Sequence, residues 1–99
     1  MKKIVLSLEH LQNRAAAHAY LQAVLALPEY YGANLDALYD CLTEIEEPTE
    51  IMISAKVSQE QYLGEYGVML LAVLQDAAND NAVLSVVAVS YTHLRAHET

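Results

Sequence analysis

Residues 27–42 read Leu-Pro-Glu-Tyr-Tyr-Gly-Ala-Asn-Leu-Asp-Ala-Leu-Tyr-Asp-Cys-Leu. Pro28 and Gly32 bound a short tyrosine-rich stretch, and Asn34 is a residue type that caps the N-termini of helices. After it, apolar residues recur at helical spacing: Leu35, Leu38, Leu42 and Ile45. The segment therefore predicts an aromatic loop over residues 28–33 that leads into a helix.

The predicted helix carries two carboxylates. Asp36 and Asp40 are four residues apart, so they project from one face, and their mutual repulsion costs roughly 0.2–0.5 kcal/mol in an isolated helix. No Lys or Arg occurs between Arg14 and Lys56, so we expect nothing nearby to neutralise this face. The pair is either a chance set of solvated charges or a surface for a cationic partner. The missing counter-charges favour the second interpretation.

The rest of the chain alternates between apolar strand-like runs and helical patterns. We expect helices over residues 13–26 and Val68–Asp80, with a short helical turn or irregular link between Val57 and Gly67. The expected strands are short and apolar: Ile4–Leu8, Glu50–Ser54 and Val83–Val89. This order predicts an α/β fold in which a small three-stranded parallel sheet is packed by about four helices.

Composition narrows the classes of function. Ninety-nine residues make one domain, and 13 acidic against 5 basic residues give a formal net charge of −8. This balance disfavours nucleic acid and anionic membranes as partners and favours a basic protein. The only cysteine, Cys41, cannot form an internal disulfide, and we interpret it as a packing residue. Without a signal peptide or membrane-spanning run, we expect a cytoplasmic chain that is monomeric when free.

The last nine residues differ in character from the rest. We expect the domain to comprise residues 1–90, and residues 91–99 to be a disordered tail or sequence foreign to the protein. His93 and His97 have the i, i+4 spacing of a metal pair, but no third ligand is evident, so no metal is expected. A chain ending at Ser90 should therefore melt at the same temperature as the full chain, and a loss of many degrees would contradict this boundary.

A second carboxylate pair lies near the end of the last predicted helix. Asp76 and Asp80 repeat the four-residue spacing at a position where the helix dipole opposes negative charge. Either they are merely solvated, or they complete an acidic surface with Asp36 and Asp40. The sequence leaves both interpretations open.

Catalysis is not expected. There is no glycine-rich phosphate loop and no Gly-x-Ser-x-Gly motif. Asp36 and Asp40 would lie on a convex helix face, whereas catalytic carboxylates need a cleft that raises one of the two pKa values. We therefore expect neither enzymatic activity nor a cofactor.

The tyrosines complete the candidate binding surface. Tyr31 is expected to pack beneath the loop, whereas Tyr30 and Tyr39 are candidates for aromatic contacts with a partner. Gly32 is expected either to adopt a positive φ or to let a partner approach the backbone closely.

At this segment the chain resembles the barstar family, the intracellular inhibitors of secreted, barnase-type bacterial ribonucleases. The resemblance is nearly continuous from Leu25 to Thr43, is carried by residues 27–32 and 34–38, and is weak elsewhere. It implies a three-stranded parallel sheet packed by helices and a loop and helix that block the ribonuclease active site.

The resemblance also assigns roles by position. Asp40 would be the principal carboxylate, among the arginines and histidine that normally hold RNA phosphate. Asp36 would meet a neighbouring arginine, and Tyr30 would pack on the catalytic histidine. Three further residues would supply close contacts: Gly32, Asn34 and Leu35.

Two departures from the family pattern affect the target. A tryptophan of the family's second helix is Tyr39 here, and glutamates near the end of the later helix appear as Asp76 and Asp80. We therefore keep an alternative, in which the chain is an acidic interaction module for another basic protein or toxin that is not a ribonuclease.

Overall fold

Three parallel strands form a single sheet in the order β1-β2-β3. The computed structural model describes residues 1–29 and 31–89. The elements along the chain are β1 (Lys2–Leu6), the 3₁₀ helix η1 (Leu8–His10), α1 (Arg14–Val24), α2 (Leu35–Thr43), β2 (Thr49–Ser54), the 3₁₀ helix η2 (Ala55–Ser58), α3 (Glu65–Asp80) and β3 (Leu84–Val89). The predicted α/β class and parallel sheet are confirmed. In the described ranges there are three α-helices and two 3₁₀ segments, where about four helices were expected.

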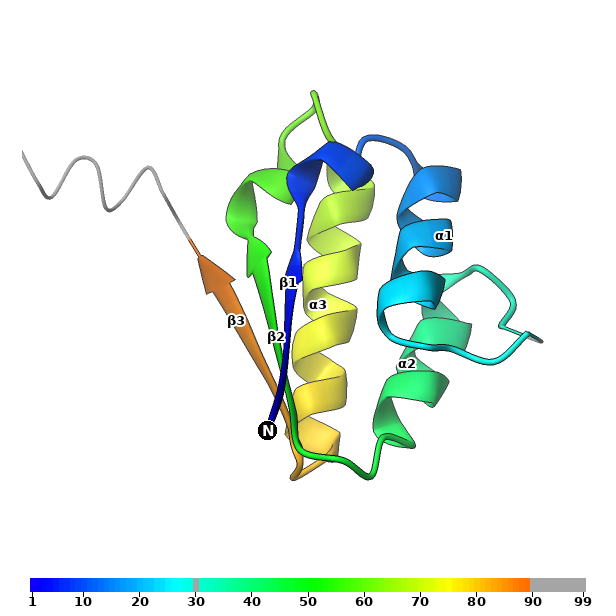
Figure 1. Cartoon of the computed structure of the whole chain (residues 1–99). Coiled ribbons are helices and arrows are strands. Elements are labelled where there is room, and N and C mark those ends of the chain that lie inside the picture. Colours follow the sequence, from blue (N-terminus) through cyan, green and yellow to red (C-terminus); the bar gives the residue numbers. More distant parts are fainter. Residues whose placement is uncertain (30, 90–99) are drawn as a thin grey trace, which may run out of the picture.

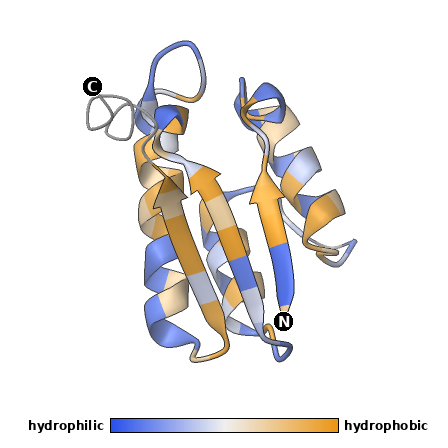
Figure 2. Cartoon of the chain, turned by 60° about the vertical axis from the view of Figure 1, so that its left-hand side comes forward, coloured by the Kyte–Doolittle hydropathy of each residue, from blue (hydrophilic) through white to orange (hydrophobic). Residues whose placement is uncertain are grey.

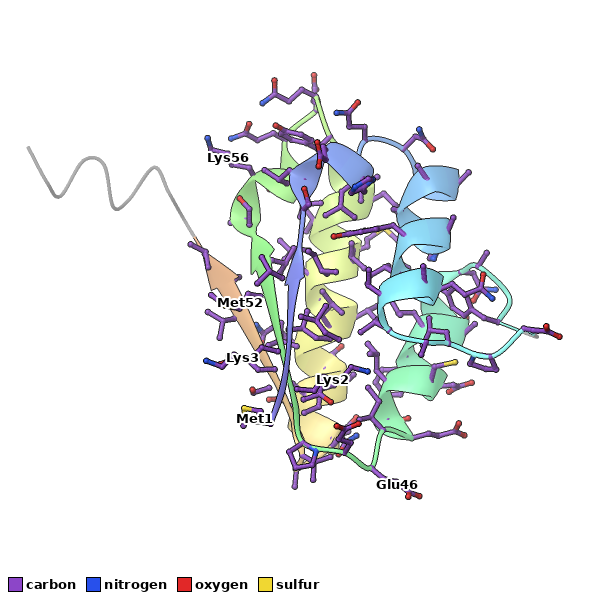
Figure 3. All side chains as sticks on the ribbon, viewed as in Figure 1. Met1, Lys2, Lys3, Glu46, Met52 and Lys56 are labelled. Atoms are coloured by element: carbon purple, nitrogen blue, oxygen red, sulfur yellow. The ribbon has the colours of Figure 1, made fainter. Side chains whose placement is uncertain are left out.

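All three α-helices lie on one side of the sheet (Figure 1). The strands follow one another in sequence order across the sheet, and parallel crossovers are right-handed, so both crossover connections fall on the same face. The other face is open and lies in front of the helices in Figure 2. Val5 is 67% exposed there and Val87 is 40% exposed, and Lys3 and Met52 point away from the helices (Figure 3).

The core lies between the sheet and the helices. β2 contributes Ile51 and Ile53, which are buried because alternate residues of the central strand face the helices. The helices contribute leucines that are fully buried: Leu21, Leu38, Leu42, Leu70 and Leu74. These contacts fix α2 against α3, and that pair of helices carries most of the predicted binding residues.

α3 begins at Glu65, three residues before the expected start at Val68. The expectation rested on Gly64 and Gly67, because glycine weakens an isolated helix. Gly64 is the N-cap of α3, and Gly67 lies inside the helix. In the fold, glycine is required at this position because a Cβ atom would lie 2.1 Å from the Val57 carbonyl oxygen of η2. Close packing of α3 on η2 therefore outweighs the low helix propensity of glycine. In the described part of the chain, no helix is long and apolar enough to cross a membrane.

Candidate protein-binding site

The loop before α2 is fastened by side chains at both ends. Asn34 caps α2 as predicted: its side-chain oxygen accepts from the Ala37 backbone N–H at 2.8 Å, and its amide donates to the Gly32 carbonyl at 3.2 Å. At the other end, the Gln22 amide of α1 donates to the Pro28 carbonyl at 3.1 Å. The Asn34 side chain therefore caps α2 and also ties the loop to the start of that helix.

The turn in this loop does not use a positive φ at Gly32, so that part of the expectation was wrong. The left-handed residue is its neighbour Ala33, with φ of 54°. Gly32 is exposed, and a Cβ atom there would lie 3.0 Å from the Asn34 side-chain nitrogen. Glycine therefore leaves room for the Asn34 side chain that reaches back to the loop.

A buried histidine anchors the loop to the helices. Tyr31 is 8% exposed, as the core interpretation predicted, and its hydroxyl bonds His18 Nδ1 of α1. The other ring nitrogen, Nε2, lies 2.5 Å from the Tyr66 hydroxyl of α3. Burial lowers the pKa of His18, and burial is also the main cause that raises the pKa of Tyr31 to about 12. At neutral pH the neutral imidazole therefore links the hydroxyls of Tyr31 and Tyr66, and the loop is held to α1 and α3.

Exposed carboxylates lie on two neighbouring helices. We call Asp36 and Asp40 of α2, with Asp76 and Asp80 of α3, the acidic face; all four residues are exposed. The Tyr39 hydroxyl donates to Asp80 Oδ2, which joins the two helices at this surface. This hydrogen bond raises the pKa of Tyr39, as do partial burial and the charges of Asp80, Asp76 and Asp40. Three carboxylates, those of Asp40, Asp76 and Asp80, therefore raise the pKa of one phenol, and Asp80 bonds it directly.

Asn81, directly after α3, fastens the end of that helix to the end of α2. Its side-chain amide donates to the carbonyl oxygens of Leu42 at 3.0 Å and Ile45 at 2.9 Å. These two hydrogen bonds tie the end of α2, and the chain just after it, to the residue that follows α3. It also fixes the backbone next to Asp80.

A groove of about 620 Å³ lies where the N-terminal parts of the three helices meet, and its lining includes Arg14, Leu35 and Asp36. The fold thus brings Arg14, which is distant from the acidic helix in sequence, to the same groove as Asp36. The Arg14 guanidinium lies 4.4 Å from the centre of the Tyr66 ring. Among residues 1–29 and 31–89, no Lys or Arg lies within 4.0 Å of a carboxylate, so the acidic face carries no direct ion pair.

The fold thus brings most of the predicted site residues to the loop, α2 and the end of α3. Tyr30 lies outside the described residues. In the described ranges, no group of three or more His, Cys, Asp or Glu side chains is placed to hold a metal ion.

Sequence reasoning missed three residues that position the site: His18, Tyr66 and Asn81. His18 lies three residues before Leu21 and seven before Leu25, a spacing that places it on the buried face of α1 and that the sequence did contain. Tyr66 is 48 positions from His18, and no local pattern joins them. Asn81 was interpreted only as a turn residue.

Comparisons with known proteins identify the family. Residues 1–90 match the Barstar family, described as "Barstar (barnase inhibitor)". The chain is also 35% identical over 81 residues to a Bacillus subtilis protein named "Putative ribonuclease inhibitor YrdF", covering 81% of this chain and 89% of that protein. The chain belongs to the Barstar family. It is therefore a member of a family of inhibitors and not of enzymes.

The His18 network makes a prediction about pH. Because burial lowers the pKa of folded His18 below the ordinary value of 6.5, the unfolded chain binds the proton more readily. The stability from neutral His18 should be fully present above pH 6.5 and lost as the pH falls below that value. In urea unfolding at pH 7 and pH 5, His18→Gln should lose less stability on acidification than the parent.

His10→Gln is the matched control, because His10 is exposed and lies on η1. It should lose as much stability on acidification as the parent. An equal pH dependence in the parent and in His18→Gln would contradict the role assigned to the buried imidazole.

Proposed function

We propose that this chain is a stoichiometric protein inhibitor of a barnase-type extracellular ribonuclease. The observation that carries the proposal is the acidic face, which two helices present next to a fastened loop and which has no direct ion pair in the described residues. Membership of the Barstar family supports the class of partner. The matched residues 1–90 form the inhibitory domain in this proposal, and residues 91–99 are not needed for inhibition.

Inhibition follows from the chemistry of the target site. A ribonuclease binds the phosphates of RNA through arginine, lysine and histidine, and a carboxylate presents the same anionic oxygens to these groups. Asp40 is the principal carboxylate, Asp36 meets a neighbouring arginine, and Tyr30 packs on the catalytic histidine. Gly32, Asn34 and Leu35 supply the close contacts around them. Bound in this way, the chain occupies the position of the substrate.

The scaffold makes this substitution effective. A loop held by Asn34, Gln22 and the His18 network needs little ordering on binding, which lowers the entropic cost of association. The formal charge of −8 attracts a basic enzyme over distances up to the Debye length of about 8 Å at 0.15 M salt. The partner is accordingly a basic secreted protein, and the inhibitor acts in the cytoplasm of the cell that makes the enzyme.

The proposal predicts that Asp40→Ala abolishes most of the inhibition. Truncating one partner of a buried, hydrogen-bonded charge pair at an interface costs roughly 2–5 kcal/mol, and the barnase–barstar complex is itself a measured example of such pairs. We expect a loss of this size in a titration of barnase activity on RNA, and no comparable loss in the free energy of unfolding, because Asp40 is exposed in the free chain.

Glu50→Gln is the matched control. It removes one negative charge from β2, where Thr49, Ile51 and Ile53 are buried toward the helices and Glu50 faces the open side of the sheet. Its inhibition should equal that of the parent. Unchanged inhibition by Asp40→Ala would refute the assigned role, and absence of inhibition by the parent would favour the alternative, a basic partner that is not a ribonuclease.

A further inference from the structure

The Tyr39 hydroxyl of α2 donates to the Asp80 carboxylate of α3. The role of this hydrogen bond in binding rests on the proposed function. Asp80 is the last residue of α3, where the helix dipole disfavours a carboxylate. Asp76 lies one turn earlier on α3, Asp40 directly follows Tyr39 on the neighbouring helix, and the charges of both add to the raised pKa of Tyr39. Left free, the Asp80 side chain would turn away from these negative charges.

Two contacts oppose that movement. The Asn81 amide fixes the backbone beside Asp80 to the end of α2, through the carbonyls of Leu42 and Ile45. The Tyr39 hydroxyl then fixes the carboxylate itself by donating to Oδ2. Tyr39 is half-buried and packs against the core through its ring, so its hydroxyl is held in position. The Asp80 carboxylate is therefore held beside α2 by side chain and backbone together.

This hydrogen bond leaves the Asp80 carboxylate able to accept further hydrogen bonds. An ionised carboxyl group accepts at about four positions, and Tyr39 occupies one of them. A tyrosine phenol with its ordinary pKa of about 10 is already protonated at neutral pH, and the raised pKa of Tyr39 favours this form further, so the phenol adds no negative charge. Asp80 can still accept the two parallel hydrogen bonds of a guanidinium group.

We propose that Tyr39 is a positioning residue that holds the Asp80 carboxylate of α3 against α2, so that α2 and α3 jointly bind arginine guanidinium groups of the ribonuclease. Tyrosine at position 39 and the short side chain of aspartate at position 80 act as a matched pair in this arrangement. In this arrangement the carboxylate at position 80 is held against α2 only when the hydroxyl at position 39 is also present.

The test is a double-mutant cycle of Tyr39→Phe and Asp80→Asn, with the dissociation constant for barnase as the readout. Tyr39→Phe removes only the hydroxyl and should weaken binding about threefold to tenfold, the range for loss of one hydrogen bond to a positioned group. Once Asp80→Asn has removed the charge, Tyr39→Phe should have almost no further effect. Additive effects of the two substitutions, or an unchanged dissociation constant for Tyr39→Phe, would overturn the proposal.

Two controls separate positioning from a structural role. Tyr62→Phe removes a hydroxyl from the segment before α3 and should leave binding unchanged. In the free chain, the phenol titration assigned to Tyr39 by difference from Tyr39→Phe should move to lower pH in Asp80→Asn, because the hydrogen bond that raises its pKa is lost. An unmoved titration would overturn the proposal without reference to any partner.

The same experiments distinguish this proposal from the proposed function. Absence of any binding of barnase by the parent chain would overturn both. Binding by the parent together with an unaltered dissociation constant for Tyr39→Phe would overturn the positioning role alone.

Discussion

The packing of α2 against α3 is the contact on which the proposed inhibitory surface depends. Buried leucines from α2 and α3 set the separation of the two helices. Gly67 has no side chain, so α3 can pack closely on η2. The polar contacts of Tyr39 and Asn81 then fix the register at the C-terminal ends. Carboxylates that are 40 positions apart in the sequence, Asp40 and Asp80, consequently belong to one surface.

The carboxylates of the acidic face form no ion pair with Lys or Arg in the described part of the chain, so they are available to a partner. Exposed like charges weaken the free chain slightly, and each costs a few tenths of a kcal/mol. Arg14 is near enough to share a groove with Asp36, yet its guanidinium lies on the Tyr66 ring. The Arg14 guanidinium thus has an aromatic partner, and a cationic protein that binds the acidic face does not have to displace an ion pair among the described residues.

Much of the fold could be predicted from local sequence, and the parts that could not depend on distant contacts. The Asn34 cap, the buried Tyr31 and the three parallel strands follow from spacing and residue type. The early start of α3 does not, because it depends on how the Gly67 backbone meets Val57. Likewise, the acidic residues of each helix were evident, but their meeting around Tyr39 depends on helix packing that no local pattern encodes.

The central claim, that the acidic face enters the ribonuclease active site, is tested most directly by competition with a nucleotide. The dissociation constant of the chain for barnase would be measured with and without a mononucleotide that saturates the active site. Binding through substrate mimicry predicts that the apparent dissociation constant rises in proportion to the nucleotide concentration. An unchanged dissociation constant at saturating nucleotide would show that the chain binds elsewhere, and would contradict the account.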